Sequence, residues 1–443
     1  MRFRSPRLQL RADSLDEKNI LHRCGGCTAG QSVSPSLEQA CRSGWPIDQV
    51  ADEQGSEATG DRSAELDRRG NGESVKRIGI LTRHVYPNYG SLLQCRALEG
   101  ALASLGAAPH VIDYFPHTDR PLRLAASRLR ESRVRSSAAK SAVYLAVQTP
   151  NMATMSLRFR KFQRRYLTLT PTCEDETGVL SLSDDVDLVL TGSDQVWNSV
   201  HGQLDPVYFL DGQKPDKKHS YAASFGSNAP SWADAHRVAS WLEDFTSVSV
   251  RERSAQAALE AMGIPSRVDV DPVLLHGREY WTEFSSSYPP VGSRYILVYQ
   301  LHNTPGFKEK LAAIRRRHNL PVRRVTPDAK MLMENRASDY LVDPAKFVAL
   351  FRDASYVVTD SFHGTAFSLA FGRPLYALLP QSNSTRNEDL LASVGLTRLA
   401  SALDDVPVED PHYDADDIAA QLLTHSGDSW SHLRELVRTG GRP

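Results

Sequence analysis

Short apolar runs alternate along most of this chain with segments whose apolar side chains recur at helical spacing. Arg77–Thr82 is an apolar run of strand length, and the apolar residues between Leu92 and Leu105 recur every three or four positions. His110–Tyr114 is the next run of strand length. Because a strand, a helix and a second strand build a parallel pair, this alternation predicts a doubly wound α/β fold.

Two such series lie in tandem. The segment Ser285–Arg294 is polar, with two prolines and a glycine, and it has the composition of a linker between them. Four runs of strand length follow it: Tyr295–Gln300, Pro321–Val325, Tyr356–Thr359 and Leu375–Leu379. We therefore predict two Rossmann-like domains, residues 75–280 and residues 281–443, with a cleft between them and a C-terminal helix in the second.

Residues 1–74 differ from the rest of the chain. They have few aromatic residues and no sustained apolar period, so they cannot bury enough surface to offset chain entropy. We predict a disordered or loosely attached extension; a start of translation near Val75 is the other interpretation. Four potential zinc ligands occur here: His22, Cys24, Cys27 and Cys41. Only one pair has zinc-knuckle spacing, so incidental thiols remain the alternative.

Composition excludes several classes of protein. The 52 lysine and arginine residues stand against 53 aspartate and glutamate residues, which argues against a protein that coats nucleic acid. No apolar run is long enough to span a bilayer, and the basic N-terminus is not followed by the apolar segment of a signal peptide. Five cysteines do not make a disulfide framework, so we expect a cytoplasmic protein.

Ligands of open α/β sheets bind beyond the carboxyl ends of the strands, so polar residues in the loops after strands are the candidates for a site. The loop that contains Asn88, Tyr89 and Gly90 joins a strand to a helix. The glycine would let the backbone approach a ligand at the N-terminus of the helix. A plain turn is the alternative.

A second loop, Thr191–Asn198, follows a strand in the same domain. Asp194 could deprotonate or hold a hydroxyl group, and Trp197 could stack on a sugar. Gln195 and Asn198 add amides at the same strand end. In the alternative interpretation the aspartate caps a helix and the tryptophan belongs to the core.

Arginines follow a third strand. Alternate residues of an extended chain point the same way, so Arg251 and Arg253 could reach one anion. Arginine matches carboxylate and phosphate groups with two parallel hydrogen bonds. A salt bridge with Glu252 is the alternative.

A fourth loop, Thr359–Thr365, joins an apolar strand to an apolar helix. His363 lies at the predicted start of that helix, beside Ser361, Gly364 and Thr365. A helix N-terminus suits an anion, and histidine exchanges protons near neutral pH. Farther along, Arg386 adds another cation. A purely structural histidine is the alternative.

The order of these motifs resembles that of the polysaccharide pyruvyl transferase family. The resemblance covers about residues 76–400 and rests on RIGILTRHVYPNYGSLLQCRALEGAL, LVLTGSDQVWN, YAASFG, SVRERS, DVDPVLL, VVTDSFHGTAFSLAFGRPLY and STRNEDLLASVGL. It implies a GT-B-like architecture of two facing Rossmann-like domains. It also implies transfer of a pyruvyl group from phosphoenolpyruvate to a sugar hydroxyl pair as a cyclic ketal, with no further cofactor and no metal.

The loops and the resemblance together give the candidate residues expected roles. His363 resembles the family's essential histidine, and Asp194 is the second expected catalytic group. The expected donor-binding residues are Arg251, Arg253, Ser361, Gly364, Thr365 and Arg386, the last of which is displaced by one position from the family's usual pattern. The expected acceptor-binding residues are Asn88, Tyr89, Gly90, Gln195, Trp197 and Asn198. The alternatives are a GT-B glycosyltransferase that uses a nucleotide-sugar and an inactive scaffold in polysaccharide assembly.

A basic segment suggests a further partner. Between Arg120 and Arg165 there are twelve lysine or arginine residues and a single acid, Glu131, with apolar residues interleaved. This pattern predicts a surface that docks on anionic lipid or on a lipid-diphosphate-linked glycan at the inner face of the membrane. Solvated helix faces are the alternative.

Overall fold

The computed structural model describes residues 75–131, 137–199, 204–226, 232–302, 304–328, 338–380, 384–402 and 411–440. All of these residues fall within one structural unit, Glu73–Pro443. The predicted N-terminal extension, with its potential zinc ligands, lies outside the described residues.

The first half of this unit is built on a parallel sheet. Its strands are β1 (Arg77–Leu81), β2 (Ala108–Val111), β3 (Leu188–Thr191) and β4 (Lys218–Ser220), in the order β2-β1-β3-β4. A short parallel pair, β5 (Ser249–Val250) and β6 (Arg267–Val268), continues beyond β4 through isolated bridges. The carboxyl ends of β1, β3 and β5 therefore lie along one edge.

The second half is built on a larger parallel sheet. Its strands are β7 (Ile296–Tyr299), β8 (Val322–Thr326), β9 (Ser338–Tyr340), β10 (Tyr356–Thr359), β11 (Leu375–Leu379) and β12 (Ala400–Ala402), in the order β12-β11-β10-β7-β8-β9. Every pairing is parallel. The α/β class with two tandem Rossmann-like halves is therefore confirmed.

Helices cover both sheets. Those of the first half are α2 (Tyr89–Ser104), α3 (Pro121–Glu131), α4 (Ala138–Tyr166), α5 (Glu176–Asp184), α6 (Trp232–Leu242), α7 (Arg253–Ala261) and α8 (Pro272–Leu275). Those that follow are α9 (Arg278–Phe284), α10 (Phe307–His318), α12 (Pro344–Asp353), α13 (Phe362–Ala370), α14 (Thr385–Ser393) and α15 (Ala415–Thr439). Short 3-10 turns lie at His117–Asp119, Pro206–Phe209, Pro215–Lys217 and Thr397–Leu399.

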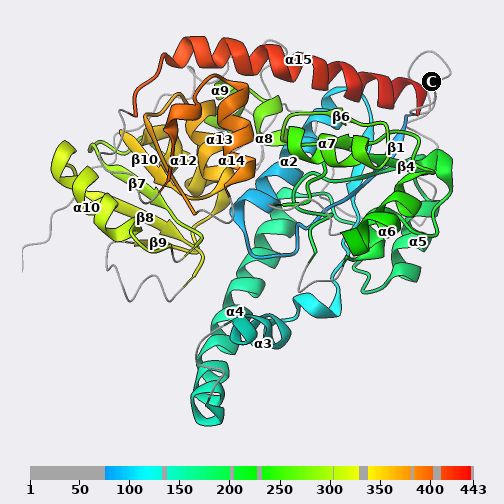
Figure 1. The fold of residues 1–443 in the computed structure, drawn as a ribbon, viewed down its shortest axis with the longest axis horizontal. Coiled ribbons are helices and arrows are strands. Elements are labelled where there is room, and N and C mark those ends of the chain that lie inside the picture. Colours follow the sequence, from blue (N-terminus) through cyan, green and yellow to red (C-terminus); the bar gives the residue numbers. More distant parts are fainter. Residues whose placement is uncertain are drawn as a thin grey trace, which may run out of the picture. The chain divides into compact units, whose positions relative to one another are not determined.

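Two further features shape this unit. Strand β4 ends at Ser220, because Ala222 takes a left-handed conformation, with φ of 46°, that interrupts an extended chain. The C-terminal helix α15 packs against both halves: Ile418 belongs to the core of the second half and Leu433 to that of the first (Figure 1).

The halves share part of their core, which holds α2 against the second sheet. Tyr89 of α2 stacks on Phe347 of α12, with ring centroids 4.4 Å apart. Its hydroxyl donates to the carbonyl of Val342 at 2.9 Å. Helix α8 contacts both α2 and α13 and so lies between the two halves. Among the helices that the structure describes, none is long and apolar enough to cross a membrane.

Candidate active site

The loop after β10 places His363 in the first turn of α13. Ser361 caps this helix, and its hydroxyl accepts from the backbone N–H of Gly364 at 3.4 Å. A side chain at Gly364 would lie 2.2 Å from Oγ1 of Thr359, so only glycine lets the helix start this close to the strand. His363 is 5% exposed and therefore faces the interior of the unit.

Helix α2 approaches His363 from the first half. A Cβ atom at Gly90 would lie 2.0 Å from Nδ1 and 2.3 Å from Cγ of the imidazole. Asn88 caps α2 and accepts from the N–H of Gly90 at 2.8 Å. The N-terminal turns of α2 and α13, with the partial positive charge that such turns carry, therefore meet at this histidine.

Asp271 lies on the other side of the imidazole. Its Oδ2 atom is 3.6 Å from Nε2 of His363, and Nη1 of Arg251 donates to the same oxygen at 2.8 Å. Its other oxygen caps α8 by accepting from the N–H of Val273. Burial opposes ionisation, but the charges of His363 and Arg251 outweigh it and hold the pKa of Asp271 well below its ordinary value.

Arg251 is the central cation of the site. It is buried, its guanidinium lies 4.1 Å from the ring centre of Phe362, and its Nε donates to Glu252 at 2.9 Å. Burial lowers the pKa of Arg251, but the neighbouring carboxylates, with that of Glu252 first, raise it above the ordinary value. Its Nη2 atom is buried and has no hydrogen-bond partner among the described residues.

Asp194 lies within the loop after β3 and has an unusual backbone conformation, with φ of 73°. Its carboxylate accepts from the hydroxyl of Ser91 at 2.5 Å. Burial opposes ionisation, but His363 and Arg251 hold the pKa of Asp194 below its ordinary value. A non-glycine residue in the left-handed region is uncommon, and such residues concentrate at functional sites.

Arg386 enters from α14 and meets the loop after β3. The amide oxygen of Gln195 faces its guanidinium, 2.7 Å from Nη1 and 3.1 Å from Nη2. The amide of Asn198 lies 2.7 Å from that of Gln195. Burial, followed by the charge of Arg251, lowers the pKa of Arg386.

A cavity of about 200 Å³ opens beside these residues. Its lining includes Arg251, Arg253, Arg386, Asp271 and Phe362. Arg253 is exposed and begins α7, whereas Arg251 is buried. The two arginines thus line one cavity, but only the side chain of Arg253 is exposed to solvent.

The structure brings some of the predicted residues together and places others elsewhere. Trp197 is 1% exposed, stacks on Phe209 and donates its indole N–H to Tyr208, so it lies in the core and offers no surface to a sugar. Tyr89 is likewise a core residue. Thr365 is buried and donates to Asn387 at 2.8 Å.

Asp271, Glu252 and Ser91 contact the site and were not predicted. Asp271 is followed by a proline, which is the pattern of a helix cap. Glu252 is expected from the sequence only as the partner of a surface salt bridge. In the structure it is buried, and its carboxylate accepts hydrogen bonds from Ser224 and Arg251 of the same half.

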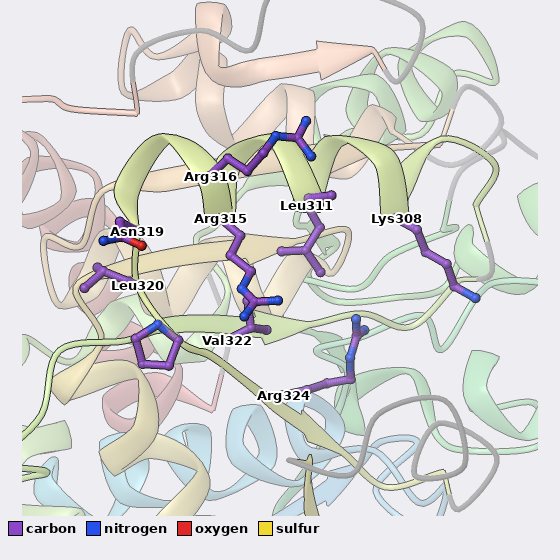
Figure 2. A pocket seen from close by; sticks show the side chains of 10 residues that line it. Lys308, Leu311, Arg315, Arg316, Asn319, Leu320, Val322 and Arg324 are labelled. Atoms are coloured by element: carbon purple, nitrogen blue, oxygen red, sulfur yellow. The ribbon is translucent and has the colours of Figure 1, made fainter.

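A larger cavity, of about 650 Å³, lies between α10 and β8. Figure 2 shows Arg315 pointing from α10 toward β8 and Arg324 pointing from β8 toward α10. Lys308 and Arg316 also line it. None of the residues predicted for catalysis or binding belongs to this cavity.

The chain is similar in structure to proteins of two kinds, epimerases and glycosyltransferases. No curated protein matches the chain. Among solved structures, a putative UDP-N-acetylglucosamine 2-epimerase from Listeria monocytogenes is 10% identical, with a TM-score of 0.46, and covers 84% of this chain and 99% of its own. The glycosyltransferase SnogD from Streptomyces nogalater is 12% identical, with a TM-score of 0.39, and covers 82% of this chain and 100% of its own.

A family model gives the more specific result. The model for polysaccharide pyruvyl transferase matches residues 88–382. That range contains His363, Asp271, Arg251 and Asp194, and it extends over more than half of the chain. The chain therefore belongs to the polysaccharide pyruvyl transferase family.

Proposed function

We propose that this protein transfers the pyruvyl group of phosphoenolpyruvate to a pair of hydroxyl groups on a glycan or a lipid-linked glycan precursor, as a cyclic ketal, in the cytoplasm. Membership of the family supports a transferase that acts in polysaccharide pyruvylation. The observation that carries the proposal is the cluster of His363, Asp271 and Arg251 where two helix N-termini meet.

The donor needs cationic and N–H contacts. Phosphoenolpyruvate carries a phosphate of about −1.5 to −2 and a carboxylate. The Nη2 atom of Arg251 is buried with no hydrogen-bond partner in the described part of the chain, and Arg253 lines the same cavity. Since Asp271 and Glu252 already balance the charge of Arg251, we expect the first turn of α13 and Arg253 to supply the remaining attraction.

The residues can be arranged into a balanced reaction. His363 gives a proton to the methylene carbon of the donor, which leaves an oxocarbenium-like centre at C2. One acceptor hydroxyl bonds to C2 and its proton passes to Asp194. The bond from C2 to the phosphate oxygen then breaks, phosphate leaves with the electron pair, and the second hydroxyl closes the ketal while its proton passes to phosphate. Acid and base assistance of this kind contributes about 10²–10⁴-fold, and neither a metal nor a further cofactor is needed.

The surroundings of His363 suit this role. Asp271 faces Nε2 and the backbone of Gly90 packs against Nδ1 and Cγ, so the ring has little freedom to turn. Asp194 lies in the loop after β3, near enough to His363 for their charges to interact, and is held by Ser91. On the proposed path, Gln195 and Asn198 are the candidates to contact the acceptor, because they adjoin Arg386 at the same strand end.

Ligand binding and turnover test this proposal together. Phosphoenolpyruvate at 100 times its dissociation constant should stabilise the folded protein by about 2.7 kcal/mol, which a thermal-shift assay detects. Release of phosphate should then depend on a glycan acceptor, and mass spectrometry of that acceptor should show the added pyruvyl ketal. Stabilisation by nucleotide-sugars with no effect of phosphoenolpyruvate would favour a glycosyltransferase and reject the proposal.

A further inference from the structure

Helices α3 and α4 form an arm that is only partly packed on the rest of the unit. The buried residues of α4 all lie between Met152 and Gln163, and those of its described residues that precede Met152 are not buried. Figure 1 shows α3 and the first part of α4 beside each other, away from both sheets. The other end of α4 is anchored, because Arg160 forms two hydrogen bonds, of 2.7 and 2.6 Å, with Asp113.

Exposed apolar side chains concentrate on this arm. Of the seven large apolar residues that are exposed in the described part of the chain, four lie on α3 and α4: Leu122, Val143, Val147 and Leu157. Each is 59–67% exposed. Exposed apolar side chains that gather into a patch mark an interaction surface, whereas single scattered ones are ordinary.

The same face of α4 carries cations and no acid. Lys140, Arg158 and Lys161 are exposed and fall at helical spacing with Val143, Val147 and Leu157, so all six share one face. The sequence of α4 contains no aspartate or glutamate. Other basic residues of the arm are engaged elsewhere, for example Arg128 with Asp328. Helices that lie in the interface of an anionic membrane bury apolar side chains at the acyl boundary, and long basic side chains beside them can extend to the headgroups.

We propose that this face of α4 docks on an anionic lipid surface, with its apolar side chains at the acyl boundary and its cations on the headgroups. A membrane fits better than a protein partner because the face combines apolar residues along several helical turns with cations that form no ion pair within the described part of the chain. The arm also adjoins the site: Arg128 donates to the hydroxyl of Tyr86 at 3.0 Å, in the loop that leads to Gly90. Docking would thus bring a lipid-linked acceptor near His363, but the inference itself does not depend on the donor.

Co-sedimentation of the full-length protein with vesicles tests the inference. Vesicles of phosphatidylcholine alone are compared with vesicles that contain about one third phosphatidylglycerol. A basic residue near an anionic surface contributes about fivefold to binding, so Lys140→Gln/Arg158→Gln/Lys161→Gln should weaken binding to the anionic vesicles by about 100-fold. Val143→Ser/Val147→Ser/Leu157→Ser should reduce it by at least tenfold.

Two matched controls separate this face from general surface effects. Leu423→Ser changes an even more exposed apolar residue on α15, and Lys308→Gln/Arg315→Gln/Arg316→Gln removes three cations around the α10 cavity of Figure 2. Both should bind vesicles like the parent protein, and all variants should keep its thermal stability and its affinity for phosphoenolpyruvate.

Equal binding to neutral and anionic vesicles would overturn the inference, as would a loss in the α10 variant that matches the loss in the α4 variants. If sedimentation velocity shows dimers that the serine variants dissociate, and vesicles bind no protein, the face pairs with a second copy and the membrane proposal is rejected.

Discussion

The close approach of α2 to α13 predicts an unusual effect of the substitution Gly90→Ala. An alanine normally stabilises a helix relative to glycine, here by up to about 1 kcal/mol. At this position, however, the new methyl group would lie 2.0 Å from Nδ1 of His363, whereas ordinary contact begins at 3.4 Å. The imidazole must therefore move by about 1.4 Å, the difference between these two distances.

Gly90→Ala should lower the rate of turnover more than it lowers the stability of the fold. Overpacking costs about 1–3 kcal/mol, so the variant should remain folded, with a melting temperature only a few degrees lower. A displacement of about 1 Å in a catalytic group can cost 10²-fold. We therefore expect turnover of phosphoenolpyruvate to fall by about 100-fold or more while the protein still unfolds cooperatively.

A second glycine of the same helix provides the control. A Cβ at Gly100 would have its nearest contact at 3.1 Å, with the hydroxyl of Tyr280, which needs to give by only a few tenths of an ångström. Gly100→Ala should keep turnover within about threefold of the parent. Calorimetry, phosphate release and thermal melts on both variants form the assay. If Gly90→Ala keeps near-parent turnover, the imidazole is not confined by α2 and the proposed geometry of the site is wrong.

Three further outcomes follow from the site and its surroundings. His363→Ala should abolish turnover in a folded protein, whereas His363→Gln should retain more donor affinity than rate; a near-parent rate in the alanine variant would make the histidine structural. Arg253→Gln should weaken phosphoenolpyruvate binding by about tenfold, measured by calorimetry, without loss of stability. Arg251→Ala should lower the unfolding free energy by about 3–5 kcal/mol in urea titration, because two buried carboxylates lose their partner, and an Arg251→Ala protein as stable as the parent would contradict this. Burial opposes the ionisation of Asp113, but hydrogen bonds from His84, Arg160 and Thr172 hold its pKa below the ordinary value. The ionised carboxylate therefore stabilises the fold above about pH 4, and this contribution is lost as the pH falls further. Asp113→Asn should destabilise the protein more at pH 7 than at pH 3 in urea unfolding, and an equal effect at both pH values would refute the ion-pair role.

Local pattern was sufficient for the elements whose apolar residues are contiguous. The strands Tyr356–Thr359 and Leu375–Leu379 have in the structure the bounds that their apolar runs predict, and His363 lies at the helix start where the strand-loop-helix pattern places it. A continuous apolar run indicates a buried strand and an apolar stripe at helical spacing indicates a helix, so residues that are near neighbours in the sequence are enough to predict these elements. The resemblance of the motifs to a family, confirmed by the family match, has the same local origin.

Long-range packing decided the rest. Asp271 and His363 belong to different halves, and no spacing in the sequence shows that their side chains lie 3.6 Å apart. The same holds for Arg251, which a local pattern presents as a free cation beside a strand but which the fold pairs with two buried carboxylates. Trp197 could have been a sugar platform or a core residue until Phe209 and Tyr208 were seen to enclose it. Which side chains are buried together depends on the docking of whole elements, and that is a property of the tertiary structure alone.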